Sequence, residues 1–159
     1  MVQFNADEIF EIAEQIERNG AAFYHRAAEG APERCARTLR RLADMEVEHQ
    51  KTFHQMRQQV AGAVAESYDP DGTAAMYLRA LAEGRVFDLR SNPAAELSGG
   101  ERVPEILKIA VGLEKESIVF YTGLKGVLPP GEARESLDRI IDEELGHITM
   151  LTKELTEIE

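Results

Sequence analysis

The sequence predicts an all-α protein, a four-helix bundle in which two antiparallel helical hairpins are joined by a long crossover. Apolar residues recur at helical spacing through four long stretches, and the alternation typical of strands is found nowhere over a useful length. Gly and Pro gather between these stretches. A chain of 159 residues has the size of one domain. We therefore expect a single domain over 1–159, divided into hairpin 5–66, crossover 67–101 and hairpin 102–159.

The first hairpin has recognisable start and turn residues. Asn5, with Glu8 three residues later, forms the pattern of a capping box at a helix start. The apolar stripe that follows ends at Gly30, and Pro32 is suited to the first turn of a second helix. Because no proline follows Pro32 before the crossover, we expect the second helix to continue to about Val64.

The crossover contains turn residues and only short helical segments. Asp69-Pro70-Asp71-Gly72 predicts a turn, Thr73 is a cap for a short helix over 74–83, and Asn92-Pro93 starts another short segment. A link of roughly 35 residues is long enough to run the length of a bundle, so the second and third helices can be parallel. That arrangement is typical of ferritin-like folds, whereas an up-and-down bundle needs no such link.

The second hairpin repeats the first. Its helices run from about Pro104 to Val127 and, after Pro129-Pro130-Gly131, on to the C-terminus. Aligned at an offset of 97 for the first helices and 98 for the second helices, the two hairpins share apolar and polar residues, so they look like copies of one unit. In the first copy the shared residues are Ile9, Ile12, Ala13, Glu17, Phe23, Tyr24, Leu39, Arg41, Asp44, Glu46 and His49.

Charge excludes some classes of partner. The chain has 29 acidic and 18 basic residues and a net charge of −11. This balance argues against nucleic acid or an anionic membrane as partner, because both require a patch of Lys and Arg. The single Cys35 rules out an internal disulfide and fits a reducing compartment, and no apolar run is long enough to span a membrane.

The repeated polar residues predict a metal site. Each hairpin has Glu-x-x-His in its second helix, as Glu46 with His49 and Glu144 with His147, and this spacing places both side chains on one helix face. A single such pair in an acidic helical protein is more often a solvated face. Here the pair is duplicated, which alone is modest support for a metal site.

The other two carboxylates, Glu17 and Glu114, lie on apolar helix faces. Glu17 and Glu46 lie equally far from the turn near residue 31, and Glu114 and Glu144 equally far from Pro129, so all four fit one layer of the bundle. Four desolvated carboxylates repel one another strongly. Two divalent cations would compensate their charge, and the two imidazoles would complete the donor set. The alternative is a purely structural helical adaptor with partly exposed acids.

Tyrosines and aspartates accompany these residues in the repeat. Tyr24 and Tyr121 each follow the first glutamate of their hairpin by two turns. They are candidates for hydrogen bonds to the ligands or for electron transfer, and core packing is an equal alternative. Asp44 and Asp142 are candidates for orienting an imidazole, although a solvated face is the commoner place for such residues.

One Glu on each of two helices, with Glu-x-x-His on each of the other two, is the ligand pattern of dinuclear sites in ferritin-like bundles. Over essentially its whole length the chain resembles the rubrerythrin-like group. The resemblance implies two iron ions bridged by Glu46 and Glu144, with one imidazole on each ion. Its terminal ligands would be Glu17 and Glu114; His49 and His147 would be the imidazoles. Manganese, or a mixed pair, accepts the same donors.

The resemblance also implies an activity and partners. It implies an oxidoreductase that reduces hydrogen peroxide or oxidises Fe(II) with O₂ or peroxide, in the response to oxidative stress. A non-catalytic iron-handling protein with the same site is the alternative. A cytoplasmic homodimer, with or without exchange of helices, is expected.

Two departures modify this picture. Rubrerythrins usually end in a rubredoxin-like domain with two pairs of cysteines, and this chain has only Cys35, so we expect a separate electron-donor protein. Ser117 stands where rubrerythrins have a seventh ligand, a carboxylate three residues after Glu114. The set of six ligands is therefore closer to the ferroxidase sites of ferritins.

Overall fold

The computed structural model describes residues 6–60, 73–82 and 91–158, and its secondary structure is helical. Asn5, at the predicted helix start, and the predicted turn at 69–72 lie outside the described residues. Four long helices and two short ones follow in order: α1 (Ala6–Glu29), α2 (Glu33–Val60), α3 (Thr73–Ala82), α4 (Pro93–Glu96), α5 (Val103–Val127) and α6 (Glu132–Ile158).

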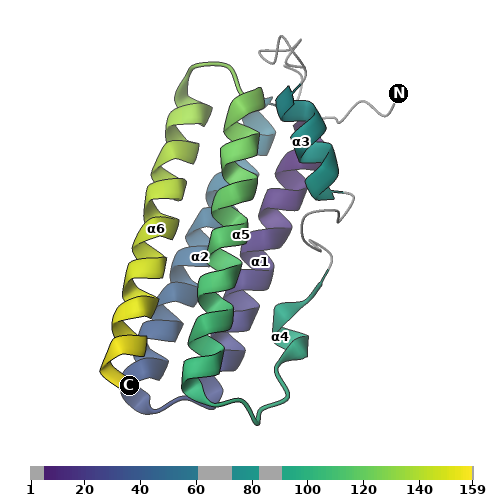
Figure 1. Cartoon of the computed structure of the whole chain (residues 1–159). Helices are drawn as coiled ribbons and strands as arrows, with labels where there is room; N and C mark the ends of the chain where they lie inside the picture. Colours follow the sequence, from purple (N-terminus) through teal and green to yellow (C-terminus); the bar gives the residue numbers. More distant parts are fainter. Residues whose placement is uncertain (1–5, 61–72, 83–90, 159) are drawn as a thin grey trace.

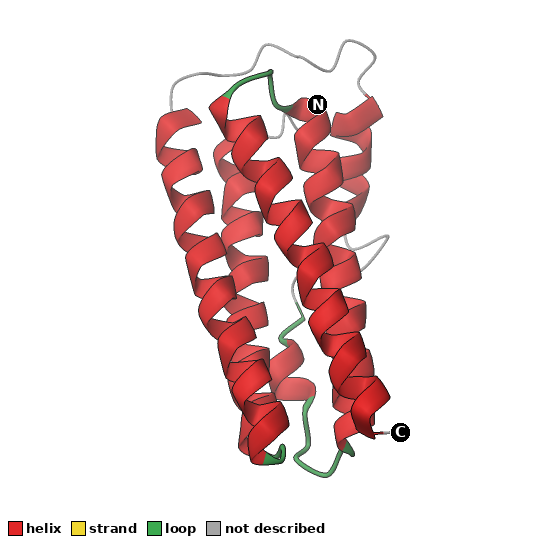
Figure 2. Ribbon diagram, turned by 90° about the vertical axis from the view of Figure 1, so that its left-hand side faces the viewer, coloured by secondary structure: helices red, strands yellow, loops and turns green. Residues whose placement is uncertain are grey.

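The four long helices form a bundle of two hairpins. α1 packs along α2 and α5 along α6, while α1 also contacts α5 and α2 contacts α6. The turn between α1 and α2 lies at the opposite end of the bundle from the turn between α5 and α6 (Figures 1 and 2). As a result α2 and α5 run in the same direction, which confirms the expected parallel arrangement. The fold is the predicted ferritin-like four-helix bundle.

Local sequence explains the helix ends in the second half. Asn92 caps α4 by accepting a hydrogen bond at 3.2 Å from the amide of Ala94. At the start of α5 the carboxylate of Glu105 accepts a hydrogen bond at 3.0 Å from the amide of Arg102, and Pro104 occupies the first turn. Gly131, with φ at 148°, has a backbone conformation that favours glycine and allows the sharp turn into α6.

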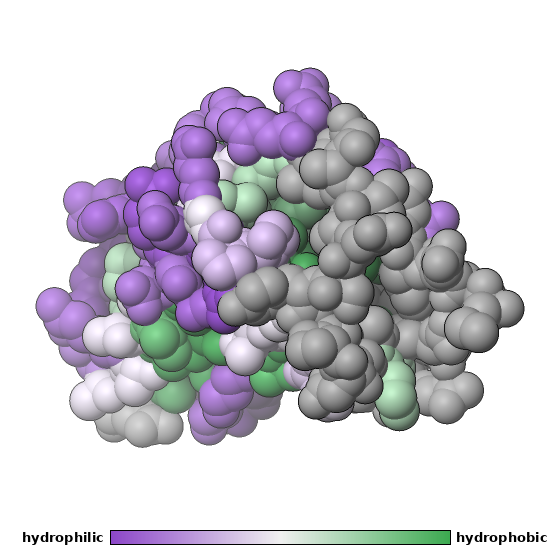
Figure 3. Space-filling model, turned by 90° about the horizontal axis from the view of Figure 1, so that it is seen from above, coloured by the Kyte–Doolittle hydropathy of each residue, from purple (hydrophilic) through white to green (hydrophobic). Residues whose placement is uncertain are grey.

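The apolar core is divided into two clusters along the bundle. One cluster surrounds Phe10, Phe53 and Leu137, and the other surrounds Phe23, Leu39 and Leu107. Between them in the sequence of every long helix lies a short polar stretch, and those stretches meet at mid-height. At one end of the bundle, hydrophilic residues fill much of the described surface around the apolar ones (Figure 3).

The two short helices cover the face formed by α1 and α5. α3 packs on α5, and α4 packs on α1 (Figure 1). The approach of α3 depends on Gly123, because a Cβ atom there would overlap the ring of Tyr77. Tyr77 also donates a hydrogen bond of 2.9 Å to the carbonyl of Val119. None of the described helices has the length and apolar character needed to cross a membrane.

Candidate metal centre

The polar stretches of the long helices bring six acidic and imidazole side chains together at the centre of the bundle. Each of them is at most 3% exposed. α1 and α5 supply one glutamate each, and α2 and α6 supply one glutamate and one histidine each, as the repeat predicts. The six residues are Glu17, Glu46, His49, Glu114, Glu144 and His147.

These side chains form two groups that overlap. In each group, four potential ligand atoms lie within 4.8 Å of one another. Glu46 and Glu144 belong to both groups; Glu17 and His49 complete the first, and Glu114 and His147 complete the second. Two glutamates shared between two sets of donors are the arrangement that a pair of bridged ions requires.

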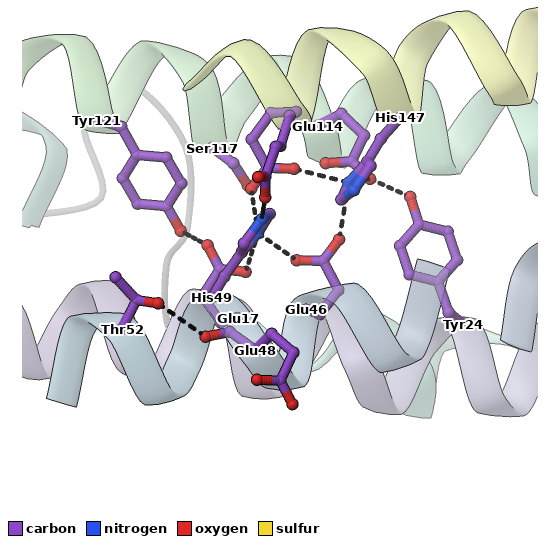
Figure 4. Close-up of polar contacts among 12 residues, drawn as sticks. Glu17, Tyr24, Glu46, Glu48, His49, Thr52, Glu114, Ser117, Tyr121 and His147 are labelled. Carbon is purple, nitrogen blue, oxygen red and sulfur yellow. Dashed lines mark hydrogen bonds and ion pairs between the residues drawn. The ribbon is translucent and has the colours of Figure 1, made fainter. Parts of the chain in front are cut away.

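Both imidazoles present Nδ1 to the glutamates. His49 Nδ1 lies 3.2 Å from a carboxylate oxygen of Glu144 and 3.4 Å from one of Glu17. His147 Nδ1 lies 2.8 Å from Glu144 and 3.2 Å from Glu46. The two rings are stacked, with their centroids 5.5 Å apart, and Figure 4 shows them on either side of Glu46.

Burial and mutual charge displace the protonation equilibria of this cluster. Burial, followed by the charge of Glu46, raises the pKa values of Glu17 and Glu114 well above the ordinary range. Burial alone would lower the pKa of His147, but the close carboxylates of the surrounding glutamates outweigh it and raise the pKa to about 12. The pKa of His49 is raised for the same reason. Without a metal ion the cluster therefore holds protons at neutral pH.

The atoms at the centre of the cluster fit a pair of metal ions. Seven buried side-chain atoms have no hydrogen-bond partner among the described residues, and six of them point into the two groups of donors: Glu17 Oε2, Glu46 Oε1, His49 Nδ1, Glu144 Oε1, Glu144 Oε2 and His147 Nδ1. Buried polar atoms left without partners are costly. Carboxylate oxygens and imidazole nitrogens are ligands that iron and manganese accept, so the side chains of the cluster fit a pair of these ions.

The two repeated tyrosines cross from one hairpin to the other. The hydroxyl of Tyr24 donates a hydrogen bond to Glu114, and the hydroxyl of Tyr121 donates one to Glu17. Tyr24 and Tyr121 lie at opposite ends of the cluster (Figure 4). Burial, and then the charge of the neighbouring glutamate, raise the pKa values of both phenols. Each phenol therefore keeps its proton and fixes the orientation of one outer carboxylate.

A small cavity of about 50 Å³ reaches the cluster between α1 and α5. Its lining includes Glu46, Glu114, Gly20 and Ser117. Gly20 and Ser117 occupy equivalent positions in the repeat, so two small residues leave this space beside the glutamates. The hydroxyl of Ser117 donates a hydrogen bond of 3.1 Å to the carbonyl of Leu113. A cavity of this size has room for at least a small molecule comparable to a few waters.

Other acidic residues nearby, among them the sequence candidates Asp44 and Asp142, lie outside the cluster. Asp44 and Asp142 are exposed, and within the described part of the chain no hydrogen bond or ion pair joins either to an imidazole. Glu14 is buried, but it lies 3.3 Å from His54 Nδ1 and belongs to neither group of donors. Glu116 lines the cavity from its exposed position on α5.

Glu143 is one residue beside the cluster that the sequence patterns do not identify. It accepts a hydrogen bond of 2.6 Å from His49 Nε2. It lies on α6 directly before Glu144, and no spacing in the sequence indicates a contact with α2.

Comparisons with known proteins agree with this geometry. The chain matches the Rubrerythrin family over residues 8–155. Among solved structures, it is similar to a crystal structure from Thermotoga maritima described as that of a candidate ferritin-like diiron-carboxylate protein, with a TM-score of 0.68 and 24% identity over 98% of this chain and 97% of that one. No curated protein sequence matches the chain. The family match covers nearly the whole chain, and the chain belongs to the Rubrerythrin family.

Proposed function

We propose that the chain is a dinuclear iron oxidoreductase that reduces hydrogen peroxide or oxidises Fe(II) at the central cluster. The observation that supports this most directly is the pair of overlapping donor groups sharing Glu46 and Glu144. Glu17 and His49 would complete the coordination of one ion. The other ion would take Glu114 and His147. Manganese in place of one or both irons is compatible with the same donors.

When bound, two iron ions supply the redox chemistry that no side chain of the cluster offers. The protein's own contribution is position and exclusion. Tyr24 and Tyr121 hold the outer glutamates at fixed orientations through their hydroxyl groups. The two apolar clusters above and below keep bulk water away from the ligands, which strengthens electrostatic interactions inside the site.

The cavity beside Gly20 and Ser117 supports a small oxidant as substrate. It touches Glu46 and Glu114, and its volume of about 50 Å³ is sufficient for O₂ or hydrogen peroxide. Ser117 stands at the position where the resemblance places a seventh carboxylate ligand. Because serine is small and has no carboxylate, this position leaves space beside the glutamates.

Metal reconstitution tests the proposal. The purified chain, loaded anaerobically with Fe(II), should bind about two irons, because two groups of donors are present. Rapid mixing with hydrogen peroxide and, separately, with O₂ should then show fast oxidation by at least one of them. Binding of clearly fewer than two irons would contradict the assignment of the site.

A second candidate function, iron handling with negligible turnover, is supported by the replacement of the seventh carboxylate by Ser117. It predicts two bound irons that both oxidants oxidise only slowly. The structural adaptor predicts instead that neither metal nor chelator changes thermal stability. The homodimer, the separate electron-donor protein and the cytoplasmic location stay predictions.

A further inference from the structure

We propose that the two metal positions are unequal, and that the ion beside His49 is held more tightly because Glu143 positions the imidazole of His49. The inference rests on the proposed function, since it concerns the same pair of ions. It goes beyond that function by ranking the two positions and by assigning a role to Glu143.

The imidazole of His49 is held on both sides. Its Nδ1 faces Glu17 and Glu144 at 3.4 and 3.2 Å. On the opposite edge of the ring, Nε2 donates a hydrogen bond of 2.6 Å to the carboxylate of Glu143. Once an ion has displaced the proton of Nδ1, this bond keeps the remaining proton on Nε2 and fixes the plane of the ring.

The imidazole of His147 is held on one side only. Its Nδ1 faces Glu46, Glu114 and Glu144, as the repeat requires. Its Nε2 is buried and has no hydrogen-bond partner in the described part of the chain. The rotamer and tautomer of His147 are therefore set from the side of the metal site alone.

The repeat shows the origin of this difference. At the offset that aligns His49 with His147, the counterpart of Glu143 is Met45. A thioether is a weak acceptor and has no negative charge, so Met45 cannot do for His147 what Glu143 does for His49. The two hairpins thus supply the same ligands and differ in the residue that supports the imidazole.

The expected difference in metal affinity follows from what carboxylates bonded to ligating imidazoles contribute in general. A carboxylate that accepts a hydrogen bond from a ligating imidazole makes the ligand more basic, and its loss lowers metal affinity about 10-fold to 100-fold. The side chain of Glu143 is 53% exposed, and water screens its charge. We therefore expect a difference near the lower end of that range.

Titration with Co(II) under anaerobic conditions tests the ranking. The metal-free chain should bind two ions in two steps whose dissociation constants differ about 10-fold. In Glu143→Ala the first step should weaken until it approaches the second. In the Co(II)-loaded chain, proton NMR should show one shifted imidazole N–H resonance that exchanges slowly with water, and Glu143→Ala should abolish it.

Two further variants test whether metal affinity depends on the position of the Glu143 carboxylate rather than on any nearby negative charge. Glu48→Ala removes a similarly exposed carboxylate directly before His49, one that pairs with Lys51 at 2.6 Å, and should leave both steps unchanged. Met45→Glu should strengthen the second step by giving His147 an equivalent acceptor. Equal affinities in the unmodified chain, or equal weakening by Glu143→Ala and Glu48→Ala, would overturn the inference. Fewer than two bound Co(II) ions would contradict the proposed function itself.

Discussion

The hairpins α1–α2 and α5–α6 supply matching donors to the central cluster but differ in what surrounds those donors. Each hairpin contributes two glutamates, one histidine and one tyrosine. The differences lie at positions next to the donors: Gly20 against Ser117, and Met45 against Glu143. The comparison shows that the donors alone require the symmetry of the repeat, while neighbouring positions are free to diverge.

Loss of a shared glutamate should have the largest effect. Glu46 and Glu144 each belong to both groups of donors, so Glu46→Ala or Glu144→Ala should reduce bound metal from about two ions to fewer than about one per chain. Glu17→Ala, which touches one group, should retain about one ion. Elemental analysis of each reconstituted variant measures this. If Glu46→Ala kept both ions, the shared role of Glu46 would be wrong.

Protons should compete with metal ions for the imidazoles of both hairpins. The raised pKa values of His49 and His147 mean that each imidazole is protonated at neutral pH without metal. An ion must displace that proton, so affinity should rise with pH, about tenfold per pH unit for each proton released. Calorimetry in buffers of different ionisation enthalpy counts the protons. A pH-independent affinity would contradict this prediction.

Substitutions at Gly20 and Ser117, the two small residues of the cavity, should differ in their effect on oxidation by peroxide. A Cβ atom at Gly20 would lie 3.4 Å from the side chain of Glu46, in van der Waals contact, so Gly20→Ala narrows the cavity and leaves that carboxylate in place. We expect oxidation by peroxide to slow on the order of tenfold with metal content unchanged. Ser117→Ala is the control, because it removes only a hydroxyl bonded to Leu113. Similar rates for both variants would argue against access through this cavity.

The main contact of α3 is with α5 in the second hairpin. A Cβ atom at Gly123 would overlap the ring of Tyr77, so Gly123→Ala should lower the free energy of unfolding by about 1–3 kcal/mol. Gly112→Ala, on the same helix with nothing within 4 Å of the added atom, should raise it by up to about 1 kcal/mol. Urea denaturation measures both. The Gly123 equivalent in α1 is the exposed Arg26, which no helix covers in this way.

The ion pair at the open end of the first hairpin should have the smallest effect. Arg57 donates two hydrogen bonds, of 2.6 and 2.8 Å, to Asp7, and this contact lowers the pKa of Asp7. The ion pair stabilises the fold at pH values above the pKa that Asp7 has in the unfolded chain. This stabilisation is lost as the pH falls through the pKa that Asp7 has in the folded chain. Asp7→Asn should therefore lower the melting temperature slightly at neutral pH and not at low pH. Equal effects at both would indicate a cause other than charge.

Much of the fold and of the cluster could be predicted because the relevant patterns are local and repeated. Helical spacing, the turn at Pro129 and the length of the crossover are enough for the bundle and its parallel helices. The duplicated Glu-x-x-His, at matched distances from two turns, was enough for six side chains to be placed in one layer. Their ligation of metal remains a prediction until an ion is measured.

The remaining features depend on how the helices are rotated against one another. The contact of Glu143 with His49 needs α6 to present a flank to α2, and nothing in the spacing distinguishes Glu143 from the exposed Asp142 before it. The crossed pairs of Tyr24 with Glu114 and Tyr121 with Glu17 likewise need the docked hairpins. Sequence periodicity assigns a side chain to a face but does not identify its partner on another helix.

The crossed tyrosines bear on how such a site could originate. Every polar contact of Tyr24 and Tyr121 with the outer glutamates joins one hairpin to the other. Two identical copies of the first hairpin, related by a twofold axis, would already contain four glutamates, two histidines and two tyrosines in this arrangement. A symmetric dimer of one such hairpin would therefore have every donor of the centre. With both hairpins in one chain, the two copies need not be identical, and unequal neighbours such as Met45 and Glu143 are permissible.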